Sequence, residues 1–330
     1  MTESADPTGS ITATVAILTY NGEAHLRRIL DALRVQTGVE GEVEILVIDS
    51  GSTDGTLAII EDFPEVRLHR IPNTEFQHGR TRNLAARLAR GEFVVYLTHD
   101  AVPIGAHWLA GMLAPFALSP DVVGVVGKQV PRPRCFPLLK YEIRGVFAGL
   151  GPDGGVTLYR RPPGELDEGA VAGLGFYSDV NSAARREVLT RTIPYREVPY
   201  AEDQLFGQDV IRAGLIKAYA PLGAVEHSND LTLAEYGKRI FDETVGLRRI
   251  GFGIPPMSRA TQLRLTVRGI LGDSLRIVRD RDFGVRRTLY WLLVNPVFQI
   301  RKWSSYRPAT TVDLSDDDAI AAGSLEASRR

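Results

Sequence analysis

The chain has 330 residues, of which 44% are hydrophobic and 24% are charged. This balance excludes a mainly disordered chain, and the length suits one large α/β domain with an appendage. A single cysteine excludes a disulfide framework, and the first ten residues lack the basic and apolar segments of a signal peptide. We therefore expect a cytoplasmic protein without a membrane-spanning segment.

Charge is distributed unevenly along the chain. Residues 231–307 contain 15 Lys and Arg against 6 Asp and Glu, whereas residues 308–330 contain 2 against 5. With an overall net charge of −1, residues 1–230 therefore carry −7. Only the 231–307 region has a charge suited to an anionic surface.

The first hundred residues alternate predicted strands and helices. Short apolar runs predict buried strands over 14–19, 43–48, 66–70 and 93–97. Apolar residues at helical spacing predict helices over 23–36, from residue 56 onward, and over 80–90. Alternating βα units with nearly continuous apolar strands are typical of a mostly parallel sheet covered on both faces, and such sheets bind ligands beyond the carboxyl ends of their strands.

Two predicted strands end in an aspartate at this edge. Asp100 follows Thr98 and His99, where it is either a turn cap or a ligand that bridges Mg²⁺ or Mn²⁺ to a diphosphate. His227 offers a second ligand, although a single histidine is as readily a structural one. Asp49 opens a turn rich in Ser and Gly, where its carboxylate can accept a hydrogen bond from a uracil or thymine ring N–H or from a ribose hydroxyl.

Basic and acidic residues also stand at two predicted helix starts. Arg82 and Asn83 follow Gln77-His78-Gly79, where an arginine and free backbone N–H groups together favour a diphosphate; the alternative is a solvated arginine. Glu202 and Asp203 begin another predicted helix, where acids favour the N-terminus through the helix dipole. The functional interpretation of this pair is a general base that deprotonates an acceptor hydroxyl during inverting sugar transfer.

The second half of the chain is predicted in less detail. Residues 131–168 are rich in Pro, Gly and Arg and are expected to form a long loop. Helices are expected over 181–189 and 202–213, a returning strand over 216–219, and mostly helices from residue 233. Residues 1–11 are expected to be flexible, and the acidic 308–330 tail to be disordered.

The motifs resemble those of a known family when they are taken together. The segments are ATVAILTYNGEAHLRRILDAL, EILVIDSGSTDGT and FQHGRTRNLAARLARGEFVVYLTHDAVP. In order and spacing they resemble a family 2 glycosyltransferase of the GT-A fold, over residues 12–230. F-x-H-G-x-T-R-N, L-T-H-D-A-x-P, DVNSAARREV, PYAEDQLFGQDVIRAG and VEHS are similar to the bacterial rhamnosyltransferase branch. The implied fold is a mixed, mostly parallel α/β sheet flanked by helices, with a C-terminal helical extension over 231–307.

The resemblance implies roles for individual residues. Asp203 would be the catalytic base, with Glu202 beside it, and Asp100 would ligate Mn²⁺ or Mg²⁺ together with His227. Thr98 stands where the family's usual D-x-D motif has its first aspartate. The residues expected to contact the nucleotide sugar are Thr19, Tyr20, Asn21, Asp49, Gly51, Arg82, Asn83, His99 and Asp100. Residues 176–186 would form part of the acceptor side.

The resemblance also implies a reaction. We expect an inverting, metal-dependent transferase that moves L-rhamnose from dTDP-L-rhamnose to a glycan or a polyprenyl-diphosphate-linked acceptor in cell-envelope polysaccharide synthesis. The alternatives are a UDP- or GDP-sugar donor with another acceptor, a metal-dependent phosphohydrolase, and a non-catalytic binding module. A nucleotidyltransferase and a dinucleotide-binding protein are disfavoured, because the turn after the first strand lacks their glycine-rich loops.

The 231–307 region has two interpretations. Apolar residues at 263, 267, 270, 271, 275 and 278 fall near one helical face, with arginines between them, and the aromatic residues Tyr290, Trp291, Phe298, Trp303 and Tyr306 follow. One interpretation is a set of helices packed on the catalytic domain with a solvated basic side. The other is a peripheral surface that binds the inner face of the cytoplasmic membrane. Nucleic-acid binding is not expected, since the aromatic residues are not interleaved with the charges.

Overall fold

The computed structural model describes residues 11–165, 167–229, 231–325 and 327–328. The chain divides into two compact units, which are treated separately below. The first runs to Val130 and resumes over Val146–His227, and the second comprises Pro131–Gly145 and Ser228–Arg330. The expected flexible N-terminus lies outside the described residues except for Ile11, which begins the first strand.

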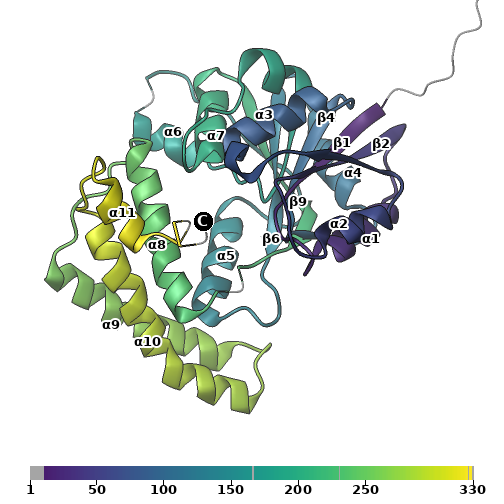
Figure 1. Cartoon of the computed structure of the whole chain (residues 1–330). Helices are drawn as coiled ribbons and strands as arrows, with labels where there is room; N and C mark the ends of the chain where they lie inside the picture. The colour runs from purple at the N-terminus through teal and green to yellow at the C-terminus, as the bar shows by residue number, and fades with distance from the viewer. Residues whose placement is uncertain (1–10, 166, 230, 326, 329–330) are drawn as a thin grey trace, which may run out of the picture. The chain divides into compact units, whose positions relative to one another are not determined.

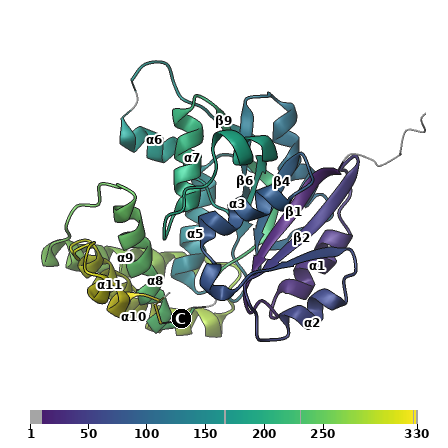
Figure 2. The same ribbon diagram turned by 45° about the horizontal axis from the view of Figure 1, so that its top comes forward.

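The first unit is built on a mixed, mostly parallel sheet (Figures 1 and 2). The strands of the described chain are β1 (Ile11–Thr19), β2 (Glu42–Asp49), β3 (Val66–Arg70), β4 (Phe93–Thr98), β5 (Val102–Pro103), β6 (Val122–Val130), β7 (Thr157–Tyr159), β8 (Asn181–Arg185) and β9 (Ile216–Glu226). Their order is β3-β2-β1-β4-β8-β6-β9-β5, with β7 paired to β9. Strand β8 runs antiparallel to both β4 and β6, and the pairs among β1 to β4 are parallel.

Helices of the first unit cover both faces of this sheet, whereas the helices after residue 228 belong to the second unit. In chain order the α-helices are α1 (Leu26–Arg34), α2 (Thr56–Glu61), α3 (His78–Leu88), α4 (Trp108–Leu113), α5 (Pro137–Gly149), α6 (Glu168–Leu174), α7 (Glu202–Arg212), α8 (Leu233–Arg249), α9 (Arg259–Arg279), α10 (Val285–Ala309) and α11 (Asp317–Gly323). Short 3₁₀ turns occur at Asn73–Glu75 and Ala114–Ala117, and a π-helical turn at Val188–Thr192.

The alternation of side chains along the strands decides which helix covers which face. Val15, Val47 and Val95 point to one face, where they share a buried cluster with residues of α1, α2 and α4. Tyr96 points to the other face and donates a hydrogen bond from its hydroxyl to the carbonyl of Arg82 in α3. Figures 1 and 2 show α1 and α2 on the side of β1 and β2 opposite to α3. The strands therefore end at a common edge between the two helical layers.

The second unit is helical. Phe136, Tyr236 and Phe298 form a buried aromatic cluster, in which they belong to the segment before α5, to α8 and to α10. Thr232 and Glu235 form a capping box that begins α8, and Ser258 caps α9. These capping residues are of the types that favour a helix N-terminus, and they explain where α8 and α9 begin.

Three structural predictions are wrong. Residues 181–185 form strand β8 and not a helix, because the segment fits between β4 and β6, and pairing outweighs the weak strand preference of Asn, Ser and Ala. The expected loop over 131–168 contains α5 and β7, and α5 begins with a proline, which suits a first helical turn. The expected disordered tail contains α11, whose Ile320 packs near Phe241 and Val245.

Candidate functional site

The parallel strands β1, β2 and β4 end at the same edge of the sheet. Their last residues bring predicted site residues to this edge. Thr19 ends β1 and pairs with Asp49, which ends β2, while the neighbouring Leu18 pairs with Thr98 at the end of β4. The backbone N–H of Ser50 donates to the carbonyl of Thr19 at 3.0 Å. The carboxyl edge expected from the sequence is therefore present, and β1 lies between the strand that ends at Asp49 and the strand that leads into the Asp100 turn.

Asp49 organises the turn that follows β2. Its side chain is fully buried, and its carboxylate accepts hydrogen bonds from the backbone N–H groups of Gly51 and Ser52 at 3.0 and 3.1 Å and from the Ser52 hydroxyl at 2.5 Å. Gly51 has φ +85°, a left-handed conformation that glycine adopts without a Cβ clash. In this geometry Asp49 shapes the turn, and its contact with a nucleoside stays a prediction.

The turn after β1 lies against the turns after β2 and β4. Asn21 accepts from the Thr53 N–H and donates from its own N–H to the Ser52 hydroxyl, both at 2.9 Å. A Cβ at Gly22 would lie 2.6 Å from Thr19 Oγ1 and 3.2 Å from His99 Cβ, so only glycine fits here. Tyr20 is exposed beside them. The structure thus brings together four of the residues expected to contact the nucleotide sugar: Thr19, Tyr20, Asn21 and His99.

Asp100 and His227 meet at the same edge, as the sequence predicted for a pair of metal ligands. The antiparallel pairing of Val102 with Glu226 brings their segments together, and His227 Nε2 lies 3.3 Å from Asp100 Oδ2. Burial raises the pKa of the Asp100 carboxyl, but the charge and hydrogen bond of His227 outweigh burial and hold this pKa well below its usual range. Asp100 therefore keeps a negative charge.

Gln129 fixes the orientation of the His227 ring. Its Nε2 donates to Ser178 Oγ at 3.1 Å, so its Oε1 is the atom that faces His227 Nδ1 at 2.9 Å. With this assignment Nδ1 carries a proton and donates it to Gln129. Nε2 then turns toward the Asp100 carboxylate either as an N–H donor or as a lone pair.

This donor set fits a divalent cation. A carboxylate and an imidazole nitrogen with a lone pair, held side by side, supply two ligands and leave the remaining positions to diphosphate oxygens and water. Within the described ranges there is no group of three or more His, Cys, Asp or Glu side chains that could hold a metal ion by itself. A cation at Asp100 and His227 would thus depend on the diphosphate of a substrate for further ligands.

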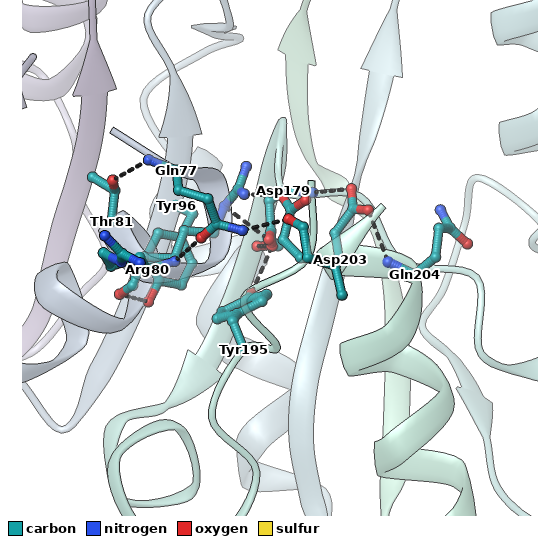
Figure 3. Close-up of polar contacts among 12 residues, drawn as sticks. Gln77, Arg80, Thr81, Tyr96, Asp179, Tyr195, Asp203 and Gln204 are labelled. Atoms are coloured by element: carbon teal, nitrogen blue, oxygen red, sulfur yellow. Dashed lines mark hydrogen bonds and ion pairs between the residues drawn. The ribbon is translucent and has the colours of Figure 1, made fainter. Parts of the chain in front are cut away.

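A second group of charges surrounds Arg82, which is buried. Figure 3 shows Asp179 and Asp203 of this group, with Tyr195 beside Asp179. Its Nε lies 2.9 Å from Asp179 Oδ2, and its Nη1 contacts Glu202 Oε1. Burial lowers the pKa of the Arg82 guanidinium, but the charges of Asp179 and Glu202 outweigh burial and raise this pKa above its usual value. Arg82 is thus held by two acids, and its predicted contact with a nucleobase or a diphosphate stays a prediction.

Asp179 stands at the centre of this group. Its Oδ1 accepts hydrogen bonds from Ser182 Oγ at 2.6 Å and from the Tyr195 hydroxyl at 2.8 Å. Asn83 holds Tyr195 in place through both its amide oxygen and its amide nitrogen, which bind the Tyr195 backbone at 2.9 and 2.8 Å. The amide of Asn83 is therefore used inside the protein, and its expected role at the nucleotide sugar is untested.

Asp203 joins the cluster from the first turn of α7. The backbone N–H of Asp179 donates to its Oδ2 at 3.3 Å, and the N–H of Gln204 donates to its Oδ1 at 2.8 Å. Ala201, just before α7, has φ 61°, a left-handed conformation that costs a residue with a Cβ about 1 kcal/mol or more. This strained residue directs Glu202 inward to Arg82 and leaves Asp203 partly exposed.

The cluster has more acids than cations, and the pKa values of two of its acids are raised. Asp179, Glu202 and Asp203 surround the single guanidinium of Arg82. Burial first, and then the charges of Glu202 and Asp179, raise the pKa of Asp203 to about 8, although Arg82 partly offsets them. Burial also raises the pKa of Asp179, against the influence of Arg82. Asp203, the partly exposed acid, is therefore poised to exchange a proton near neutral pH.

The two groups are connected through hydrogen bonds and one pair of neighbouring residues. From Asp203 the connection runs through the N–H of Asp179 to its neighbour Ser178, then to Gln129. Gln129 in turn bonds His227, which faces Asp100. The carbonyl of Val180 also accepts from the N–H of Thr98, next to the Asp100 turn. The proton-exchanging acid and the pair suited to a cation are thus linked along the central strands of one sheet.

Sequence reasoning missed the residues that make this connection. Asp179 is the first residue of the motif DVNSAARREV, which carries the family resemblance, and Ser178 stands just before it, but neither was assigned an individual role, and residues 181–189 were expected to form a helix. Strand β8 shows the reason for the motif, because its first residues lie between the ends of β4 and β6. Gln129 and Tyr195 had no local signal, since their partners lie 16 to 112 residues away in the chain.

Comparisons with known proteins agree with the resemblance. A family model described as "Glycosyl transferase family 2" matches residues 14–191. The O-antigen chain rhamnosyltransferase RfbN of Salmonella typhimurium is 28% identical over 234 residues, which is 70% of this chain and 71% of that protein. An N-acetylglucosaminyl-diphospho-decaprenol L-rhamnosyltransferase of Mycobacterium tuberculosis is 29% identical over 242 residues, 64% of this chain and 75% of that protein.

A solved structure matches the fold. The crystal structure of S. aureus TarS 1–349 in complex with UDP has a TM-score of 0.50 and 17% sequence identity, and the match covers 91% of this chain and 90% of that one. The GT-A fold expected from the sequence is confirmed by this likeness and by the mixed, mostly parallel sheet.

Proposed function

The chain belongs to glycosyl transferase family 2, and we propose that this glycosyltransferase moves L-rhamnose from dTDP-L-rhamnose, with inversion, to a hydroxyl of an acceptor in cell-envelope polysaccharide synthesis. The acceptor is a glycan or a sugar on a polyprenyl diphosphate. The names of two relatives support these choices, since both are rhamnosyltransferases, one for an O-antigen chain and one for a decaprenyl-diphosphate-linked sugar.

One observation carries the proposal. Asp203, with a pKa of about 8, is linked through Asp179, Ser178 and Gln129 to the Asp100–His227 pair. Inverting transfer needs a base beside the acceptor and a means of stabilising the departing diphosphate, both held around one activated sugar. The connected groups supply residues for both needs at the edge where ligands of such sheets bind.

Asp203 is the base of the proposed reaction. In its ionised form it takes the proton of the acceptor hydroxyl, while the hydroxyl oxygen forms a bond to the anomeric carbon. The bond from that carbon to the diphosphate oxygen breaks on the opposite face, and the nucleoside diphosphate leaves with the electron pair. Glu202 is turned away toward Arg82 and acts by holding Arg82, so it is a positioning residue in this scheme.

Asp100 and His227 would hold a divalent cation, Mn²⁺ or Mg²⁺. Such a cation, when bound, offsets the negative charge that develops on the leaving diphosphate. The protein's own contribution is to place the Asp100 carboxylate beside His227 and to keep the His227 ring oriented through Gln129. Ring orientation by a neighbouring side chain is a general requirement of histidine ligands.

The turns after β1 and β2 would bind the nucleoside. Tyr20 is exposed there, and Thr19 Oγ1 is a buried hydroxyl without a hydrogen-bond partner among the described residues. The turn that begins at Asp49 accepts a hydrogen bond from Asn21 through its Ser52 hydroxyl, and this contact keeps the turn after β1 beside the turn after β2. We carry Thr19, Tyr20, Asn21, Asp49, Gly51 and His99 into the proposal as the nucleoside side of the site.

A thermal-shift screen with Mn²⁺ tests the donor. A ligand that binds only the folded state at about a hundred times its dissociation constant stabilises it by about 2.7 kcal/mol, so dTDP-L-rhamnose should raise the melting temperature more than UDP- or GDP-sugars do. A larger shift with a UDP- or GDP-sugar would replace the proposed donor. Release of free rhamnose from dTDP-L-rhamnose, with no transfer to any glycan or lipid-linked acceptor, would instead indicate a hydrolase.

Two variants separate binding from chemistry in the same assay. Asp203→Asn should bind the donor as the wild type does and lose transfer, because it removes the base and keeps the shape. Asp100→Ala should lose the Mn²⁺-dependent part of donor binding measured by calorimetry. Unchanged affinity of Asp100→Ala in the presence of Mn²⁺ would remove the cation from this site.

A further inference from the structure

Apolar side chains point outward from the two longest helices of the second unit. Helices α9 and α10 lie side by side and form a hairpin (Figure 1). Their exposed apolar residues, here called the outer stripe, are Leu263, Val267, Leu271, Leu275 and Val278 of α9 and Val285, Leu289, Tyr290, Leu293, Val297 and Ile300 of α10. These positions recur every three or four residues in each helix, so they share one face of it. The most exposed, Leu293, is 79% accessible.

Several of the side chains buried on the inner face of the hairpin are polar, and Ile277 is buried beside them. Asn295 is fully buried and donates from its amide to the carbonyl of Ile270 and to Ser274 Oγ. Gln299, also buried, donates to Asp273 at 2.6 Å. These buried polar residues depart from the usual pattern of a helix in water, in which polar residues face solvent and apolar residues face the partner. A hairpin with hydrogen bonds inside and leucines outside suits an apolar surrounding.

The structure also corrects which residues could provide such a surface. Of the aromatic residues considered from the sequence, Phe298 is buried, and Trp291 and Tyr306 pack against the aromatic cluster of the second unit. Tyr290 is exposed within the outer stripe. The apolar surface is therefore mainly aliphatic, and most of the aromatic residues serve the core.

The same hairpin carries many more basic than acidic residues. Helices α9 and α10 contain ten Lys and Arg and one acid, Asp273, which is buried and paired with Arg276. In the parts of the chain that the structure covers, Arg264, Arg268 and Arg286 have no ion pair with an acid. They are exposed and stand within one or two positions of outer-stripe residues.

A basic cavity adjoins the turn between the two helices. It has a volume of about 340 Å³, and four of its lining residues are Arg144, Arg276, Arg279 and Arg281. The aspartates that also line it are already used, because Lys140 binds both Asp280 and Asp282, at 2.7 and 2.9 Å. Arg279 and Arg281 have no acidic partner among the described residues, so the cavity can accept an anion such as a phosphate.

A second copy of the chain is a poor match for this surface. In a two-fold dimer the same patch faces itself, so the unpaired arginines of one copy would meet those of the other. Phospholipid headgroups of negative charge complement both features, since arginines bind their phosphates while the apolar side chains enter the layer beneath. Among the described helices, none is both long and apolar enough to cross a bilayer.

We infer that the α9–α10 hairpin binds the surface of an anionic phospholipid bilayer, with the outer stripe in the headgroup layer and the cavity arginines on lipid phosphate. The inference is independent of the sugar and the acceptor proposed above. It places the enzyme on the surface where an acceptor carried on a lipid would be found.

Sedimentation of the full chain with vesicles tests whether the α9–α10 hairpin binds an anionic bilayer. The vesicles are phosphatidylcholine alone or phosphatidylcholine with about one third phosphatidylglycerol. We expect binding to the anionic vesicles that weakens as salt is raised. Leu271→Gln with Leu293→Gln should lower the partition coefficient at least about tenfold, since two buried leucines are lost. Arg268→Gln with Arg279→Gln and Arg281→Gln should lower it about a hundredfold on anionic vesicles only.

Matched controls use equally exposed residues of the first unit. Leu118→Gln with Leu222→Gln removes two exposed leucines, and Arg160→Gln with Arg161→Gln and Arg191→Gln removes three exposed arginines. Both controls should bind vesicles as the wild type does, and circular dichroism checks that each variant is folded. Wild-type binding by the hairpin variants, or equal loss in the controls, would overturn the inference. So would a stable dimer that the Leu271 and Leu293 changes dissociate without lipid.

Discussion

The raised pKa of Asp203 leads to a stability prediction that does not depend on knowing the substrate. In the unfolded chain this carboxyl ionises near its ordinary pKa of about 4. In the folded protein it holds its proton to about 8, because it is surrounded by protein and faces Glu202 and Asp179. Between these two values the folded state binds one more proton than the unfolded state. The stability that Asp203 contributes is therefore full at low pH and is lost as the pH rises through about 8.

The size of the effect follows from the linkage. One proton of difference lowers the free energy of unfolding by up to about 1.4 kcal/mol for each pH unit, so up to about 2.7 kcal/mol between pH 5 and 7. Asp203 is partly exposed, and its ionisation is coupled to that of the neighbouring acids. Both facts reduce the change in the free energy of unfolding, and we expect about 1–2 kcal/mol. Asp203→Asn removes this titrating group. Relative to the wild type, the variant should become more stable by that amount as the pH goes from 5 to 7.

Urea unfolding of both proteins across this pH range measures the difference. Asp209→Asn is the matched control, because Asp209 lies on the same helix and its carboxylate binds Arg196 and Arg212. Removal of these ion pairs should make the control less stable than the wild type. Parallel stability curves for Asp203→Asn and the wild type would refute the raised pKa of Asp203.

Transfer assays on the same variant test the chemical role. Loss of a general base typically costs about 10²-fold or more in rate, with donor binding retained. In the wild type, the rate should rise with pH toward about 8 as Asp203 ionises. Near-normal turnover by Asp203→Asn would assign the base to another residue and would leave the stability argument untouched.

Three further substitutions test the residues that hold Asp203 and His227 in place. Asp179→Asn should lower the free energy of unfolding by about 3 kcal/mol in urea, because it takes one buried partner from Arg82; a loss under 1 kcal/mol would make this pair dispensable. Gln129→Leu should weaken Mn²⁺ binding in the presence of dTDP by about 10- to 100-fold in calorimetry, because His227 loses its orienting acceptor, and equal affinity would exclude that role. Ala201→Val should destabilise the protein by more than 1 kcal/mol in thermal unfolding, and Ala201→Gly should not, because φ is 61°; similar losses from both would mean that backbone strain is unimportant.

The local patterns of the sequence were sufficient for most of the elements that position the site. The apolar runs that end at Thr19, Asp49 and Thr98 are buried parallel strands, and the helix predicted from residue 202 is α7. These predictions succeed because periodicity and strand-end residues report on burial and turns within a few residues of each other. The expected meeting of Asp100 and His227 also holds, at 3.3 Å, although 127 residues separate them in the chain; the family resemblance supplied that pair.

Only the tertiary structure decided how the acids are used. Arg82 was expected at a diphosphate and is held between Asp179 and Glu202, and Asp179 itself comes from a segment predicted to lead into a helix. The raised pKa of Asp203 and the buried polar residues of the α9–α10 hairpin likewise depend on partners far away in the chain. Burial and the pairing of charges are properties of the packed chain, because the distance between two groups in space is not encoded in their spacing along it.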